Sequence, residues 1–140
     1  MLEQVLARAT PAFTQRVAAR MEKLSAQQAA RRAVAAHAAS DAGAVDAIAP
    51  AHVCAALNRV LRDRDVVINE AIRNAPFVLS QITRDVPLTL LGCAGGGLGY
   101  SGGMALGIKL ARPDARVVQI VGDGGFHFST PSSEIGRAHV

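Results

Sequence analysis

The sequence has few aromatic residues: it contains no tryptophan, one tyrosine and four phenylalanines among 140 residues. Lysine is also scarce, since thirteen of the fifteen basic residues are arginine, and no run of basic residues is longer than two. A nucleic-acid-binding surface needs clustered cations, and single-strand binders add aromatic side chains on which bases stack. The composition therefore argues against nucleic acid as a partner.

Cysteine is equally scarce. Cys54 and Cys93 belong to no CxxC pair and stand in apolar surroundings, which predicts buried free thiols in a reducing compartment. The N-terminus lacks the apolar core of a secretory signal, and Glu3 and Glu22 are unusual for an organellar transit peptide. We therefore expect a cytoplasmic protein.

A long hydrophobic helix is missing as well. Residues 86–108 carry no charge, but eight of these twenty-three residues are glycine, and Pro87 and Ser101 interrupt the run further. A membrane-spanning helix needs about 20 predominantly apolar residues. No membrane segment is expected in this part of the chain, and no membrane partner.

The first forty residues predict helix, because apolar residues recur there at helical spacing. Thr10 and Pro11 predict a helix start, with a capping hydroxyl followed by proline at the first position. The apolar stripe is narrow, so we interpret residues 1–45 as a helical interdomain linker. The residues of the apolar stripe are Leu6, Phe13, Val17, Met21 and Leu24.

The middle of the chain alternates apolar runs with helical patterns. This alternation predicts an α/β fold over residues 46–133, a partial doubly wound parallel sheet covered on both faces. Pro76 is expected to interrupt one helix, because proline inside a helix removes a hydrogen bond. The expected strands are residues 66–68, 88–91 and 116–121, and the expected helices are residues 52–62, 71–81 and 104–111.

Two expected strands end in an acidic residue, Glu70 and Asp123, at the sheet edge where such folds bind ligands. Asp123 stands among Gly122, Gly124 and Gly125, and glycine leaves amides exposed and lets other groups approach. A carboxylate beside phosphate needs a divalent cation between them, and Mg²⁺ binds carboxylates together with phosphates. The pattern predicts a magnesium and phosphate site; a tight turn around a solvated Asp123 is the alternative.

A second glycine segment precedes the helix expected at 104–111. We call residues Gly95–Gly99 the glycine loop. Backbone amides at the start of a helix favour anions, so this loop is a candidate anion site. Leu98, a large apolar residue among glycines, is interpreted as an element that shapes a ligand; a flexible loop with Leu98 packed on the helix is the alternative.

The stretch GCAGGGLGYSGGMALGIKLARPDARVVQIVGDGGFHF, residues 92–128, resembles the diphosphate-binding domain of thiamine diphosphate-dependent enzymes. It is most similar to the acetolactate synthase and benzoylformate decarboxylase group. By this resemblance, Asp123 would bind Mg²⁺, Gly96 would offer its carbonyl to the aminopyrimidine, and Leu98 would bend the cofactor. The full implied cofactor-binding set is Glu70, Gly96, Gly97, Leu98, Gly122, Asp123, Gly124 and Gly125, with Asn69 beside it.

The resemblance also implies an activity. Thiamine diphosphate enzymes of this group act on 2-oxo acids, and the cofactor stabilises the carbanion that remains when carbon dioxide leaves. The carboxylate that activates the cofactor belongs to another domain, usually in a partner chain, so no catalytic residue is expected here. The resemblance implies a homodimeric or homotetrameric full-length parent, with FAD in some relatives. Synthase, decarboxylase and oxidase reactions all remain open.

A dinucleotide-binding Rossmann domain is the rival interpretation. Residues 97–102 satisfy GxGxxG, a helix follows, and Asp123 comes about twenty residues later, as that fingerprint requires. A Rossmann first strand normally runs directly into its first glycine. Here the apolar run at 88–91 is short and is separated from Gly97, which argues against NAD.

The end of the chain departs from these patterns. Residues 134–140, EIGRAHV, resemble the translated read-through of a sequencing adapter, so we expect a tail foreign to the domain; a genuine short tail is the alternative. The family completes its metal motif with a downstream Asn, and no Asn follows Asn74. By the resemblance, the second Mg²⁺ ligand and the later strands of the sheet would be missing, and an unpaired sheet edge would remain. We therefore expect a poorly stable polypeptide that binds the cofactor weakly and is inactive alone, with an inert remnant as the alternative.

Overall fold

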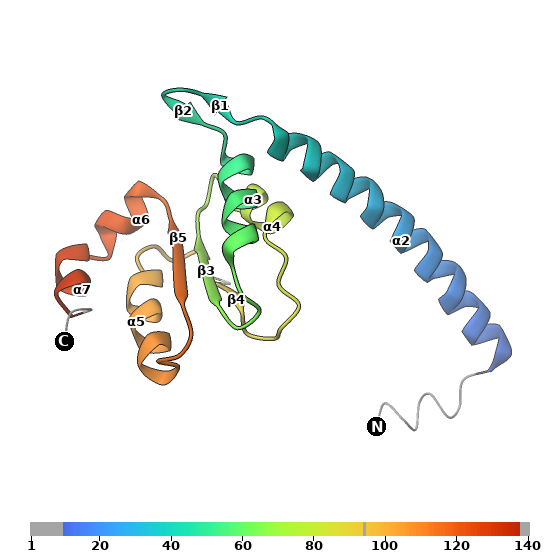
Figure 1. Ribbon diagram of the computed structural model, residues 1–140. Helices are drawn as coiled ribbons and strands as arrows, with labels where there is room; N and C mark the ends of the chain where they lie inside the picture. The colour runs from blue at the N-terminus through green and yellow to red at the C-terminus, as the bar shows by residue number, and fades with distance from the viewer. Residues whose placement is uncertain (1–9, 94, 138–140) are drawn as a thin grey trace. The chain divides into compact units, whose positions relative to one another are not determined.

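The computed structural model describes residues 10–93 and 95–137, drawn as a ribbon in Figure 1. The chain divides after His37 into two units, and each is described by itself. Within the described ranges, no helix combines the length and the apolar character that crossing a membrane demands.

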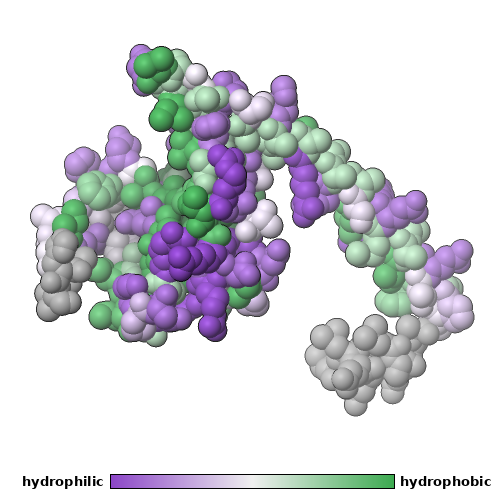
Figure 2. Space-filling view, viewed as in Figure 1, coloured by the Kyte–Doolittle hydropathy of each residue, from purple (hydrophilic) through white to green (hydrophobic). Residues whose placement is uncertain are grey.

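The N-terminal unit is dominated by helix α2, Pro11–Ser40. The predicted start is confirmed, because Pro11 is its first residue and Thr10 Oγ1 accepts the amide hydrogen of Phe13 at 3.3 Å. None of the helix's residues is buried. Figure 2 shows its surface in pale green and purple, which matches a sequence rich in alanine and arginine.

A small hairpin follows α2, where only a break was predicted. Strands β1 (Gly43–Ala44) and β2 (Ala47–Ile48) pair antiparallel. Gly43 has a φ of 82°, a left-handed conformation that favours glycine, and its amide donates to Asp41 Oδ1 at 2.8 Å. Helix α3, Pro50–Val60, begins directly after the hairpin.

The second unit is built on a three-stranded parallel sheet. Its strands are β3 (Val66–Glu70), β4 (Leu90–Gly92) and β5 (Val117–Val121), in the order β4-β3-β5. The central strand β3 is almost completely buried, as the continuous apolar run at its start predicts for a parallel sheet.

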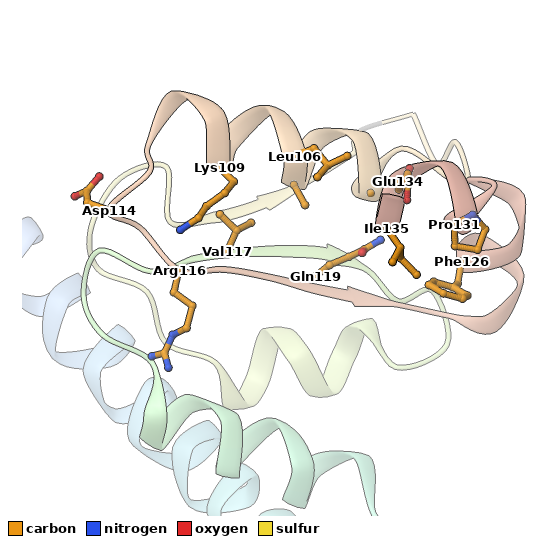
Figure 3. A pocket seen from close by; sticks show the side chains of 12 residues that line it. Leu106, Lys109, Asp114, Arg116, Val117, Gln119, Phe126, Pro131, Glu134 and Ile135 are labelled. Carbon is orange, nitrogen blue, oxygen red and sulfur yellow. The ribbon is translucent and has the colours of Figure 1, made fainter. Parts of the chain in front are cut away.

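Helices cover both faces of this sheet, which confirms the predicted α/β fold. Helices α3 and α4 (Ala75–Gln81) pack on one face, and α5 (Ser101–Ala111) packs on the other (Figures 1 and 3). The expectation that residues 71–81 are only partly helical is confirmed, but Pro76 does not break the helix. The helix begins only at Ala75, so Pro76 falls in the first turn, where a missing amide costs no hydrogen bond.

Two short helices complete the described chain after β5. They are α6 (Asp123–Phe128) and α7 (Pro131–Arg137), and α7 packs against α5. Glu134 of α7 lies against Gly102, where any added Cβ would overlap its carboxylate. The structure thus places part of the segment predicted to be foreign next to the domain.

The core lies between the sheet and helices α3 and α4. Cys54, Val67, Ala71, Val78 and Ile82 form its buried cluster. Both thiols are free, as predicted, but Cys93 is exposed and not buried, because it follows β4 beyond the edge of the sheet.

Val67→Ala is expected to lower the free energy of unfolding by about 2 kcal/mol, from the transfer of two methyl groups plus a cavity term. The side chain of Val67 is fully buried, with 0% exposed. Val53→Ala is the matched control, because Val53 is 48% exposed and should lose little. Urea unfolding measures both variants, and equal losses would contradict this location of the core.

Candidate functional site

The parallel strands bring their carboxyl ends to one edge, as predicted. Glu70 at the end of β3 is paired with Val121 at the end of β5, and Asn69 is paired with Gly92 at the end of β4. The glycine loop follows β4 and Asp123 follows β5. Both glycine segments therefore leave the sheet at the same edge.

Asp123 is the first residue of helix α6, and not part of an open loop. Gly122 is the extended residue before the helix, and its carbonyl accepts the amide hydrogen of Phe126 at 2.9 Å. The Asp123 side chain is exposed, and no described residue donates a hydrogen bond to its carboxylate. A hard, anionic oxygen ligand is thus available at this edge.

The glycines around Asp123 differ in what surrounds them. A Cβ added at Gly122 or Gly124 would meet nothing within 4 Å. Gly125 is buried, and a Cβ there would lie 2.7 Å from Glu70 Oε1. Glycine is required at 125 by this close approach, whereas Gly124 leaves its backbone open to solvent or a ligand.

Glu70 is buried, and its carboxylate is engaged by the protein itself. Oε2 accepts the Ser101 amide hydrogen at 2.9 Å and the Ser101 hydroxyl, and Oε1 accepts the Gly99 amide hydrogen. The anion at the start of α5 is therefore a side chain of this chain. The Gly99 and Ser101 amides are not available to an external anion, so this part of the predicted anion site is corrected.

The Glu70 carboxylate is charged at neutral pH. Burial raises the pKa, but hydrogen bonds from Ser101 and Gly99 outweigh burial and hold the pKa below its ordinary value. A lowered folded-state pKa contributes stability above the unfolded-state value, and this contribution is lost as the pH falls through the folded-state value.

The free energy of unfolding is therefore expected to fall as the pH drops below about 4.5, the ordinary pKa of Glu70. In Glu70→Gln, unfolding titrations between pH 3 and pH 6 should show a shallower decline. Part of the decline should persist, because the pKa of Asp65 is also lowered. If the free energy of unfolding of Glu70→Gln fell as steeply with decreasing pH as that of the native chain, the charged Glu70 carboxylate would not be stabilising the fold.

The rest of the glycine loop is open. Gly96 has a φ of 65°, and neither Gly96 nor Gly97 has an atom within 4 Å of an added Cβ. Leu98 is 43% exposed, so it projects from the loop and is not packed as a core residue. Gly99 approaches α6 closely, with its Cβ position 2.9 Å from Phe128 Cδ1. The loop and α6 are direct neighbours.

Tyr100, Ser101 and Gln119 make hydrogen bonds beside this edge and were missed as site residues. Gln119 Nε2 donates to Ser101 Oγ at 2.7 Å, and the Tyr100 hydroxyl donates to the Asn69 carbonyl at 2.7 Å. Gln119 interrupts the apolar strand β5, and a polar residue in such a strand requires a partner, which was the available signal. Asn69 uses its own Oδ1 to accept the Ala71 amide hydrogen at 3.1 Å.

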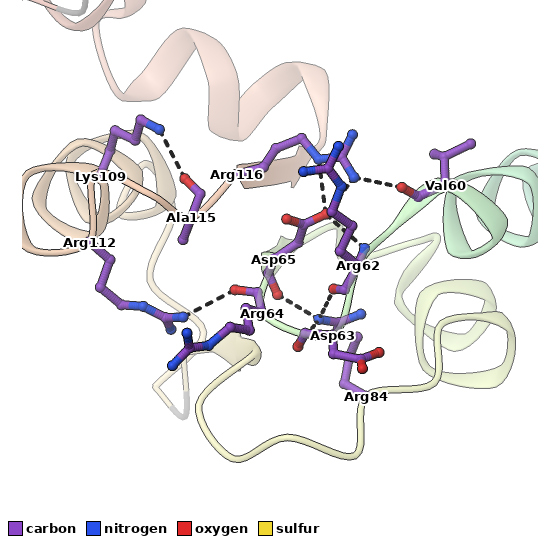
Figure 4. A network of polar contacts seen from close by, with 10 residues as sticks. All are labelled: Val60, Arg62, Asp63, Arg64, Asp65, Arg84, Lys109, Arg112, Ala115 and Arg116. Carbon is purple, nitrogen blue, oxygen red and sulfur yellow. Dashed lines mark hydrogen bonds and ion pairs between the residues drawn. The ribbon is translucent and has the colours of Figure 1, made fainter.

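The opposite edge of the sheet carries an arginine-rich network (Figure 4). Buried Asp65 pairs with Arg116 and accepts the Arg62 amide hydrogen at 2.8 Å. Burial raises the pKa of Asp65, but these contacts outweigh burial and lower it. Arg84 Nη2 donates to three carbonyls of residues 62–65. The cations thus stabilise the turn before β3.

A separate hollow of about 590 Å³ lies along the outer side of β5 (Figure 3). Leu106, Val117 and Ile135 contribute apolar lining, and Lys109 and Arg116 are among its charged residues. Neither Asp123 nor the glycine loop lines it. Gly102, Gln119 and Phe126 also line it, so the hollow reaches elements of the carboxyl edge without including Asp123 or the glycine loop.

A metal site at the carboxyl edge would depend on Asp123. In the described part of the chain, no group of three or more His, Cys, Asp or Glu side chains is arranged to hold a metal. A magnesium ion here would need oxygens from a bound ligand, which is how Mg²⁺ commonly binds together with phosphates. Asp123 and the open glycines fit such shared coordination.

The parallel sheet and its two neighbouring glycine segments form an α/β domain whose carboxyl edge is a candidate ligand site. Residues 74–138 match the family model described as "Thiamine pyrophosphate enzyme, C-terminal TPP binding domain". Residues 74–138, just under half of the chain, are therefore similar to the thiamine diphosphate-binding domain of this enzyme family. The match includes the glycine loop and α6 and extends past Ser133; Glu70 lies before it.

A solved structure supports the same assignment. The chain is similar to the thiamine diphosphate-dependent 4-hydroxybenzoylformate decarboxylase of Rhodococcus jostii RHA1, with a TM-score of 0.59 and 26% sequence identity. The similarity covers 62% of this chain and 16% of the decarboxylase chain. The family match and this similarity favour thiamine diphosphate over the dinucleotide interpretation.

Proposed function

We propose that residues 46–133 bind the diphosphate end of thiamine diphosphate through Mg²⁺ coordinated by Asp123. The observation that carries this proposal is the exposed Asp123 carboxylate, which accepts no hydrogen bond from the described residues and stands beside the open backbone of Gly124. A carboxylate would repel a diphosphate unless a cation lay between them. The open backbone leaves room for the phosphate oxygens.

The remaining roles follow from the positions of the loops. The amides of Gly124 and Gly125 would donate to the diphosphate, with Gly122 giving α6 its extended entry. Gly96 and Gly97, which have free space around them, would let the cofactor approach the backbone. Exposed Leu98 would supply an apolar surface against which the cofactor bends.

The chemistry of the parent enzyme is the second part of the proposal. When bound, thiamine diphosphate supplies an electron sink for a carbanion at a 2-oxo acid carbon. We propose a 2-oxo acid substrate, in an acetolactate synthase-like or decarboxylase reaction, supported by the decarboxylase named above. The activating carboxylate would come from another domain, in a homodimeric or homotetrameric cytoplasmic parent, so this chain alone should not turn over substrate.

A matrix of thermal unfolding measurements tests the proposed ligand. Ligands that bind only the folded state raise the unfolding midpoint by mass action. The midpoint should rise when thiamine diphosphate and Mg²⁺ are present together, and much less with either alone. A rise with NAD and no metal would support the dinucleotide alternative. No rise with any combination would support an inert remnant.

A further inference from the structure

Glu70 contacts both glycine segments at the carboxyl edge. Its Oε1 accepts the Gly99 amide hydrogen and also lies where a Cβ on Gly125 would be, at 2.7 Å. Its Oε2 accepts both donors of Ser101. One buried carboxylate at the end of β3 therefore reaches the glycine loop, the start of α5 and the first turn of α6.

The network extends to the neighbouring strand. Ser101 Oγ donates to Glu70 and accepts a hydrogen bond from Gln119 Nε2 at 2.7 Å, which connects the carboxylate to β5. Both carboxylate oxygens of Glu70 are already used, and its side chain is only 6% exposed. Glu70 thus has little capacity to bind a cofactor directly.

We propose that Glu70 is a positioning residue that couples the glycine loop to the start of α6, so that the two halves of the cofactor site are held in one arrangement. Only the expected effect of this coupling on ligand binding rests on the proposed function. The structural part of the coupling depends on the contacts of Glu70 alone. A buried, fully hydrogen-bonded carboxylate fixes its partners because any displacement leaves a charge unsatisfied.

A double-mutant cycle tests the structural part in the 140-residue chain. Gly125→Ala should lower the thermal midpoint by about 5 °C or more, because the new methyl group meets the carboxylate. The loss should persist with Glu70→Gln, which keeps the same volume. The loss should shrink to less than half with Glu70→Ala, where Val121 Cγ2 at 3.1 Å is the main remaining neighbour.

Equal losses from Gly125→Ala in all three backgrounds would overturn the coupling. A stabilising osmolyte in every sample keeps marginal variants measurable, since excluded co-solutes favour the folded state. If Glu70→Ala does not fold, the coupling is tested in Glu70→Gln by the nuclear magnetic resonance titration described next.

The ligand part uses Mg²⁺ with inorganic diphosphate, a probe that carries only the diphosphate group of the proposed cofactor. In the native chain, the amide signals of Gly124 and Gly125 should shift, and those of Gly99 and Ser101 should shift with them. In Glu70→Gln, only the α6 signals should still respond. Undiminished responses of Gly99 and Ser101 would overturn the positioning role. No response at Gly124 in the native chain would instead contradict the proposed function. The double-mutant cycle would then still show whether Glu70 couples the two segments.

Discussion

Asp123→Asn should abolish the magnesium-dependent part of thiamine diphosphate binding. The amide keeps the size of the side chain but removes the charge that holds Mg²⁺ beside the diphosphate. Because loss of a residue that merely supports a metal ligand costs up to about 100-fold in affinity, loss of the ligand itself should cost at least that. The fold should be unaffected, since the Asp123 side chain is exposed and accepts no hydrogen bond from described residues.

Asp114→Asn is the matched control for this variant. Asp114 is also exposed, and its substitution removes the same charge, but Asp114 precedes β5 at the opposite edge of the sheet. Titration calorimetry with thiamine diphosphate, with and without Mg²⁺, measures both variants. Equal weakening in the two variants would show that overall charge, and not coordination by Asp123, governs binding.

Gly99→Ala is expected to lower the free energy of unfolding by about 2–5 kcal/mol, the sum of a left-handed backbone penalty and overpacking. Gly99 has a φ of 80°, which side chains with a Cβ rarely adopt. Its Cβ position lies 2.9 Å from Phe128 Cδ1 and 3.1 Å from the Ser129 nitrogen. The substitution should therefore separate the glycine loop from α6.

Gly97→Ala provides the comparison within the same loop. Gly97 has no positive φ and no atom within 4 Å of an added Cβ, so Gly97→Ala should change the free energy of unfolding little in the absence of cofactor. Urea unfolding followed by circular dichroism measures both. If Gly99→Ala were as stable as Gly97→Ala, the close contact between the glycine loop and α6 would be wrong.

The sheet and its ligand-binding edge could be predicted because they follow from local patterns. Val66, Val67 and Ile68 form the uninterrupted apolar run of a central parallel strand, and Val117–Val121 is a second apolar run that contains one polar residue, Gln119. Parallel strands align their carboxyl ends, so Glu70 and Asp123 had to emerge at one edge.

The role of Glu70 could not be predicted in the same way. Its partners Gly99 and Ser101 lie 29 and 31 positions further along the chain, and no periodic pattern specifies which loop crosses a strand end. Helix α6 was missed because Gly124 and Gly125 each cost about 1 kcal/mol against alanine in a helix, which local propensity alone disfavours. Contacts between residues far apart in the sequence decide both features.

The most direct test of the central claim is a nuclear magnetic resonance titration of the isotope-labelled chain with thiamine diphosphate, first without and then with Mg²⁺. Amide shifts report even weak binding and locate it on the chain. We expect signals of residues 96–98 and 122–125 to shift together, and only when Mg²⁺ is present. Shifts that ignore Mg²⁺, or that fall on the hollow along β5 and spare Gly124, would contradict this claim.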